Sequence, residues 1–196
     1  MIMENDKLKK AIQLFDQANA LDPNSETYQG KEYPKELLYA MRMTDRLNAF
    51  APNASEALQL TARCQHICRW EIARESYEMN REGYLRWRQD LKKFHAKKAS
   101  DILTKVGYDQ TTIDKVVFLL EKKQLKKNED TQTLEDVICL VFLEFYFDAF
   151  TKKHPEEKLV DILQKTWRKM SDQGHEAAMK LPLPDTSVRL IKKALA

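Results

Sequence analysis

Apolar residues recur at steps of three and four along almost the whole chain, the spacing of one face of an α-helix. Leu8, Ala11, Ile12 and Phe15 begin the pattern, and similar stretches follow it. Only four glycines and six prolines interrupt the 196 residues, which is few for a fold built on frequent turns. The chain is therefore predicted to be all-α, and sandwiches, barrels and glycine-looped nucleotide folds are disfavoured.

Turn and capping residues divide this pattern into helices. The tripeptide 22–24 (Asp-Pro-Asn) ends the first helix, Pro34 begins the second and Pro52 closes it. Gly107 follows a long periodic stretch and is expected to cap its C-terminal end. Neither a repeat nor a composition shift marks a boundary, so residues 1–196 are predicted to form a single bundle domain. The predicted helices cover approximately 8–18, 34–50, 55–69, 81–106, 111–123, 134–150, 156–170 and 185–195.

Charge, cysteine content and hydropathy set the class of protein and its compartment. The 33 basic and 30 acidic residues leave a net charge of +3, which argues against a disordered chain and against a wholesale nucleic-acid coat. Three cysteines are too few and odd in number for a disulfide framework. The longest apolar run, 137–150, contains Glu144 and Asp148 and is too short to span a bilayer. The sequence therefore predicts a cytoplasmic protein without a membrane segment.

The stretch 134–150 is apolar nearly all round, which is typical of a helix at the centre of a bundle. Glu135 and Asp136 stand near its start, where a buried carboxylate needs a partner or a metal ion. Thr133 followed by Asp136 also fits a variant capping box, and both acids suit the positive end of a helix dipole. Two interpretations stay open, a cap alone or a cap that also forms part of a catalytic site.

The predicted helix over 55–69 carries several polar groups inside a half-apolar pattern. Steps of three and four place Arg63 and His66 on one face, and Gln65 and Arg69 on a neighbouring line. So many polar groups need partners, and an anionic ligand would supply them.

The predicted helix over 81–106 interleaves basic and aromatic residues, a pattern that can grip phosphates and stack bases. The alternative is a solvated basic face opposite an apolar stripe. His95 and Lys98 flank the buried face and are placed to approach a pocket. The predicted apolar stripe consists of Tyr84, Leu91, Phe94 and Ile102.

Several short motifs are specific and are spread over nearly the whole chain. They are 63–70 (RCQHICRW), 83–88 (GYLRWR), 94–96 (FHA), 134–137 (LEDV), 165–171 (KTWRKMS) and 174–175 (GH). With these motifs the chain resembles an uncharacterised family, domain of unknown function 4202. The resemblance implies a small helical protein and names no activity.

The helix order is more distantly similar to that of the HD-type phosphohydrolases, in which histidines and aspartates surround a metal ion that activates water. The resemblance places Asp136 at the late aspartate, Gln65 and His66 at the His-Asp doublet, and Tyr39 near the first histidine. No His-Asp pair occurs in this chain. The resemblance therefore implies an HD-like fold with an altered metal motif, and a divalent metal ion stays open as a cofactor.

The function that these features favour is an enclosed anion-accepting pocket, with a phosphohydrolase-like reaction on a nucleotide or another phosphorylated small molecule. Two alternatives stay open: a non-catalytic RNA- or nucleotide-binding module, and an interaction protein whose polar residues only specify the bundle. The expected catalytic residues are Asp136, Glu135 and His66. The expected binding residues are Arg63, Gln65, Arg69, His95 and Lys98.

Overall fold

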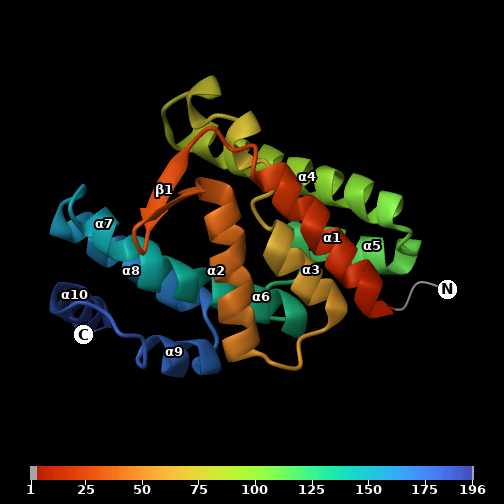
Figure 1. The fold of residues 1–196 in the computed structure, drawn as a ribbon. Coiled ribbons are helices and arrows are strands. Elements are labelled where there is room, and N and C mark those ends of the chain that lie inside the picture. Colours follow the sequence, from red (N-terminus) through yellow and green to blue (C-terminus); the bar gives the residue numbers. More distant parts are fainter. Residues whose placement is uncertain (1–3, 196) are drawn as a thin grey trace. The chain divides into compact units, whose positions relative to one another are not determined.

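The structure is a computed structural model that describes residues 4–195, with side chains from Asp6 onward. Ten α-helices and one two-stranded hairpin make up the regular structure of these residues, joined by short 3-10 and π-helical segments (Figure 1). The all-α prediction is confirmed. In chain order the elements are α1 (Glu4–Asn19), β1 (Ser25–Tyr28), β2 (Lys31–Pro34), α2 (Lys35–Phe50), α3 (Glu56–Cys64), α4 (Arg81–Val106), α5 (Gln110–Leu120), α6 (Glu129–Val141), α7 (Phe147–Thr151), α8 (Glu156–Lys169), α9 (Asp172–Ala178) and α10 (Asp185–Leu195).

These elements belong to two units. The first takes the chain up to Asp45 together with Asn53–Lys123, and the second takes Arg46–Pro52 and the chain from Gln124 onward. A single domain over 1–196 stays a prediction. Over residues 4–195, no helix combines the length and the apolar character that crossing a bilayer requires. The cytoplasmic location stays a prediction.

Helices α1, α3, α4 and α5 enclose the core of the first unit. Phe15, Leu60, Leu103 and Val116, one from each helix, are fully buried there. Both ends of α4 agree with the sequence, and Gly107 has the left-handed backbone conformation (φ 90°) expected of a C-cap. Tyr84 was predicted for the core stripe of α4, and this is wrong, because the residue is 43% exposed.

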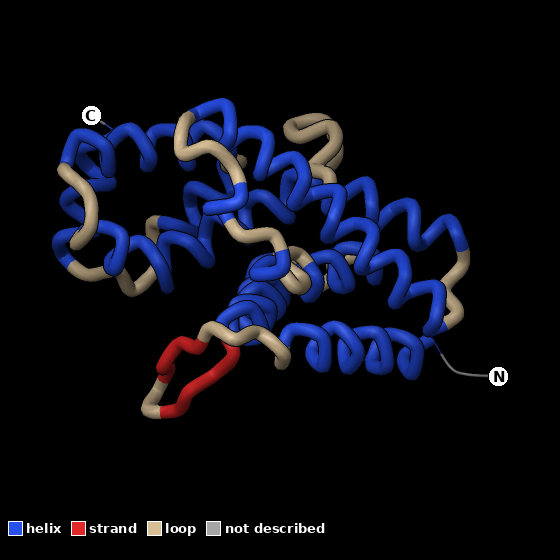
Figure 2. Tube along the Cα trace, turned by 90° about the horizontal axis from the view of Figure 1, so that it is seen from above, coloured by secondary structure: helices blue, strands red, loops and turns tan. Residues whose placement is uncertain are grey.

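The hairpin between α1 and α2 was not predicted. Its strands pair antiparallel from Ser25 opposite Pro34 to Tyr28 opposite Lys31. Gln29 (φ 50°) and Gly30 (φ 75°) form the turn, and two successive left-handed residues are what a two-residue hairpin of type I′ requires. Figure 2 shows the hairpin in red, and Arg42 of α2 contacts it through an ion pair of 2.6 Å with Glu26. Its polar sequence hid it from a search for alternating apolar residues.

Helix α3 is shorter than predicted, ending at Cys64 and not near Arg69. Beyond it the chain turns through residues 65–68, and Cys68 adopts a left-handed conformation (φ 51°). The buried side chain of Asn19 accepts a hydrogen bond of 2.9 Å from the backbone N–H of Cys68 and so fixes this turn. The shared helical face predicted for residues 63–70 therefore does not form.

The second unit is built around the predicted central helix. Helix α6, a π-helical segment (Phe142–Tyr146) and α7 follow one another, and Leu140, Leu143 and Phe147 are buried in the core. The helix begins earlier than predicted, because Asn128 accepts a bond of 2.9 Å from the N–H of Thr131 and acts as its N-cap. The capping box predicted for residues 133–136 is wrong for that reason.

Candidate functional site

Four of the sequence-predicted site residues come together in the first unit. Gln65, His66, Arg69 and His95 line one pocket, with a volume of about 20 Å³. A cavity needs about 10–15 Å³ of such volume to hold one water molecule, so this pocket has room for one or two. The remaining residues that line the pocket are Arg88, Leu91, Lys92, Leu120 and Lys122.

Three segments bring these side chains together. The turn after α3 supplies His66 and Arg69, whose backbones are linked by a bond of 3.1 Å from the N–H of Arg69 to the carbonyl of His66. Helix α4 supplies residues at 88, 91, 92 and 95, because steps of three and four face one side. The end of α5 supplies Leu120, and Lys122 follows it in a left-handed conformation (φ 56°).

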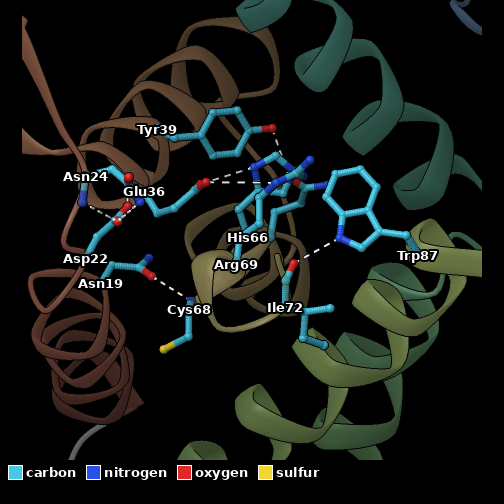
Figure 3. Close-up of polar contacts among 11 residues, drawn as sticks. Asn19, Asp22, Asn24, Glu36, Tyr39, His66, Cys68, Arg69, Ile72 and Trp87 are labelled. Atoms are coloured by element: carbon cyan, nitrogen blue, oxygen red, sulfur yellow. Dashed lines mark hydrogen bonds and ion pairs between the residues drawn. The ribbon is translucent and has the colours of Figure 1, made fainter. Parts of the chain in front are cut away.

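His66 is held on three sides (Figure 3). Its ring stacks on Tyr39, with the ring centroids 4.1 Å apart, and the hydroxyl of Tyr39 donates a bond of 2.9 Å to the side-chain oxygen of Gln65. Nε2 of His66 lies 2.9 Å from Nη1 of Arg69, and Nδ1 lies 3.3 Å from Oε2 of Glu36. Because arginine has only donors, Nε2 must accept, and the ring proton therefore lies on Nδ1 and faces Glu36.

Glu36 is the carboxylate of this site, and it was not predicted. Its position in the first turn of α2 is fixed by Asp22, whose Oδ2 accepts a bond of 2.9 Å from the backbone N–H of Glu36. The residue is only 8% exposed, and burial raises the pKa of its carboxyl to about 7, although the charge of Arg69 opposes this shift. No local pattern marks Glu36 as buried, since a glutamate in a first helical turn is ordinarily solvated.

Arg69 connects this cluster to α4. Its guanidinium lies 4.9 Å from the ring centroid of Trp87. The Nε atom of Arg69 lies 4.0 Å from Oε1 of Glu36. The indole N–H of Trp87 donates a bond of 2.9 Å to the carbonyl of Ile72, which fixes the plane on which Arg69 rests. Burial lowers the pKa of Arg69, but a guanidinium stays protonated in proteins, so the pocket keeps this positive charge.

His95 carries the most unusual atom of the pocket. The residue is only 5% exposed, its ring centroid lies 5.8 Å from that of His66, and its buried Nε2 has no hydrogen-bond partner. Burial, together with the nearby Arg69 and Arg88 charges, lowers its pKa well below the usual range, so the ring is neutral at pH 7. Buried polar atoms without a partner are rare, and one on a residue that lines a pocket is a candidate to bind a ligand there.

The pocket is electropositive. Four cationic side chains and two imidazoles line it, and no acidic side chain is among the lining residues. Burial also lowers the pKa of His66 well below its usual range, so the positive charge comes from arginine and lysine alone. Such a surface favours an anion. The four cations are Arg69, Arg88, Lys92 and Lys122.

Two of the predicted binding residues have other partners in the same unit. Arg63 forms a two-point ion pair with Asp16, at 2.7 Å from Nε and 2.6 Å from Nη2, and reaches the hydroxyl of Thr44. Lys98 pairs with Glu71 at 2.8 Å. Neither Arg63 nor Lys98 lines the pocket.

Replacing Arg63 with methionine is therefore expected to affect stability and not binding. The change removes a charge-assisted pair, and we expect the free energy of unfolding to fall by about 1–2 kcal/mol, as measured by urea denaturation. Phosphate affinity, measured by calorimetry, should stay at the wild-type value. A folded variant that no longer binds phosphate would show that Arg63 takes part in ligand binding.

Glu135 and Asp136 belong to the second unit. Asp136 accepts bonds from the N–H of Ser171 at 2.8 Å, from the hydroxyl of Ser171 at 2.6 Å, and from Gln132 at 3.1 Å. Ser171 in turn caps α9, a helix that was not predicted. A Cβ on Gly174 would lie only 2.6 Å from Oδ1 of Asp136, so a glycine is needed there.

Glu135 is buried and lies 3.7 Å from the ammonium group of Lys169. Through its bonds to Ser171, Asp136 anchors the start of α9. Catalytic roles for Asp136 and Glu135 stay predictions.

The side chains of the pocket do not fit a divalent metal ion. Among the side chains described, from Asp6 to Leu195, no group of three or more histidines, cysteines, aspartates or glutamates is placed to hold one. Both nitrogens of His66 already have partners, and Arg69 occupies the lone pair of Nε2 that a metal would need.

Comparison with known proteins adds one finding. No curated protein and no solved structure shows significant similarity to the chain. The model of one protein family, described as Domain of unknown function (DUF4202), matches residues 9–191, which is nearly the whole chain. The resemblance drawn from the motifs is thereby confirmed, and the chain belongs to the DUF4202 family.

Proposed function

We propose that the first unit binds the phosphate group of a phosphorylated small molecule or nucleotide. The observation that supports this most is the partnerless Nε2 of the buried His95, a residue of the pocket lined by four cations and no carboxylate. A neutral imidazole can carry its proton on Nε2 and donate it to a phosphate oxygen. The orphaned atom would then gain the partner that the protein alone does not supply.

The cationic side chains suit this ligand in charge and in shape. The guanidinium groups of Arg69 and Arg88 can each donate two parallel bonds to phosphate oxygens. The pocket volume of about 20 Å³ admits the inward-facing oxygens of one phosphate group and not a whole nucleotide. The rest of the ligand must therefore lie toward the solvent.

A phosphohydrolase-like reaction is the second candidate, and the neutral state of His95 favours it. With its proton on Nδ1, His95 could take a proton at Nε2 from a water molecule whose oxygen attacks phosphorus. The P–O bond to the leaving group would break, and the leaving oxygen would keep the bonding electrons and take a proton from solvent. The contacts of Tyr39 with the ring of His66 and with the side chain of Gln65 are compatible with an HD-like ancestry without the metal. A non-catalytic binding module would use the same pocket.

Replacing Arg88 with glutamine is expected to weaken phosphate binding without unfolding the protein. A charge-assisted bond to the ligand is lost, so the dissociation constant for inorganic phosphate or AMP, measured by titration calorimetry, should rise by about 10- to 100-fold. Arg86→Gln is the matched control, because Arg86 lies on the same helix, pairs with Glu82 and does not line the pocket.

Equal losses in both variants would indicate a general charge effect and would contradict the pocket. Wild-type protein that binds neither phosphate nor AMP would overturn the proposed function. Release of inorganic phosphate from AMP by the wild-type protein, absent in a His95→Gln variant that still binds AMP, would favour hydrolysis over binding alone.

A further inference from the structure

The ring of Tyr84 is exposed at a position where the sequence predicts a core residue. Tyr84 lies on α4, one helical turn before Arg88, and 43% of its surface is open to solvent. The exposed tyrosine presents part of a flat aromatic ring to the solvent, where a ligand can contact it.

The surroundings of Tyr84 hold the ring in place. The ring of Trp87 is tilted by 46° to it with the ring centroids 5.9 Å apart, and the guanidinium of Arg74 lies 6.0 Å from the centroids of both rings. Arg74 is itself fixed by three backbone carbonyls, at 3.1 Å from Tyr77, 2.8 Å from Glu78 and 3.3 Å from Asn80. The exposed ring is therefore held by its contacts with Trp87 and Arg74, and the guanidinium of Arg88 also lies over it, 6.0 Å from the ring centroid.

Gly83 allows the loop to approach the helix this closely. A Cβ at this position would lie 2.1 Å from the backbone oxygen of Glu78, which is shorter than any real contact. The N–H of Gly83 also donates a bond of 2.8 Å to the side chain of Asn80, which caps α4. The loop and the first turn of α4, which carries Tyr84, thus pack closely against each other.

Arg88 connects this surface to the pocket. One of its nitrogens lies 3.3 Å from the hydroxyl of Tyr84, and the same side chain lines the pocket. Residues four apart on a helix are separated by about 6 Å along its axis. A ligand whose phosphate enters the pocket could therefore place a flat ring on Tyr84 while Arg88 lies between the two.

We infer that Tyr84 is the stacking surface for a nucleobase, so that the ligand of the pocket is a nucleotide and not a sugar phosphate or a free phosphate ion. The inference rests on the proposed function. Every base has a flat face that stacks on an aromatic ring, and such stacking tolerates different bases. A sugar phosphate has no flat ring and would leave Tyr84 unused.

The test compares three probes on variants of Tyr84. Removal of the ring in Tyr84→Ala should raise the dissociation constant of AMP by about 5- to 100-fold and leave those of ribose 5-phosphate and inorganic phosphate unchanged. Tyr84→Phe, which keeps the ring and loses the hydroxyl, should bind AMP nearly as the wild type does. Leu85→Ala is the control, since Leu85 is the next residue on the helix and is 55% exposed.

The outcomes separate this inference from the function on which it rests. Wild-type protein that binds AMP no more tightly than ribose 5-phosphate overturns the inference and leaves the phosphate pocket intact. A Tyr84→Ala variant that loses all three probes equally also overturns it, because Tyr84 would then act only by positioning Arg88. Wild-type protein that binds none of the three probes overturns both.

Discussion

Replacing His95 with methionine is expected to stabilise the protein and to abolish phosphate binding. The buried Nε2 has no partner, and an unsatisfied polar atom of this kind costs about 1–3 kcal/mol. Methionine fills a similar space without a polar atom to satisfy, so the free energy of unfolding should rise by about 1 kcal/mol or more. The same change removes the proposed hydrogen bond and lines the pocket with an apolar chain, and the affinity for phosphate should fall by at least about 100-fold.

Urea denaturation and titration calorimetry on one preparation measure both effects. His95→Gln is the control, because glutamine keeps a donor at this position and should retain part of the binding. A purely structural histidine would give the opposite result, namely a less stable methionine variant with unchanged phosphate affinity. A substitution that raises the free energy of unfolding and lowers the affinity for the ligand is typical at a residue that is retained for function.

The helices could be predicted where their limits depend on local chemistry. Asn80 and Gly107 cap α4 through bonds to residues within five positions, and the sequence places the ends of that helix correctly. The start of α6 was misplaced because two capping signals compete, and Asn128 caps the helix ahead of Thr133. The end of α3 was misplaced because Asn19, far away in the sequence, holds the turn at Cys68.

The candidate site was predictable only in part, for a similar reason. The residue types of the motif over 63–70 indicated unpaired polar groups, and His66 and Arg69 do line the pocket. Glu36 could not be found, because its burial depends on Asp22 and on the turn after α3, neither of which is visible near it in the sequence. Arg63 has the same chemistry as Arg69, and only the tertiary pairing with Asp16 separates their roles.

Replacing Glu36 with glutamine is expected to change how stability depends on pH. Burial raises the pKa of Glu36 from 4.5 to about 7, so between these values the folded protein holds a proton that the unfolded chain has released. The contribution of Glu36 to the free energy of unfolding therefore falls as the pH rises, by about 2–3 kcal/mol from pH 5 to pH 8. Glutamine does not titrate, so the variant should gain this amount relative to the wild type over the same range.

Urea denaturation of both proteins at pH 5, 6, 7 and 8 gives the difference directly. His66 and His95, whose pKa values are lowered, make stability rise with pH up to about 6.5 in both proteins, and this common part cancels. Parallel profiles for the wild type and Glu36→Gln would show that Glu36 titrates as an ordinary carboxyl and that the cluster around Arg69 is more open than its geometry indicates.

The same carboxyl links pH to the proposed ligand. Ionised Glu36 attracts Arg69, the residue that phosphate would also engage, so a bound phosphate should favour the protonated form of Glu36. Glu36 should then take up protons when phosphate binds near pH 7, and the difference between the wild type and Glu36→Gln isolates this part from the ionisation of phosphate itself. Calorimetry in buffers of different ionisation enthalpy measures this uptake, which should be smaller in Glu36→Gln. The glutamine variant should also bind phosphate more tightly than the wild type at pH 8 and about equally at pH 5, because only at the higher pH does the wild type carry the competing charge.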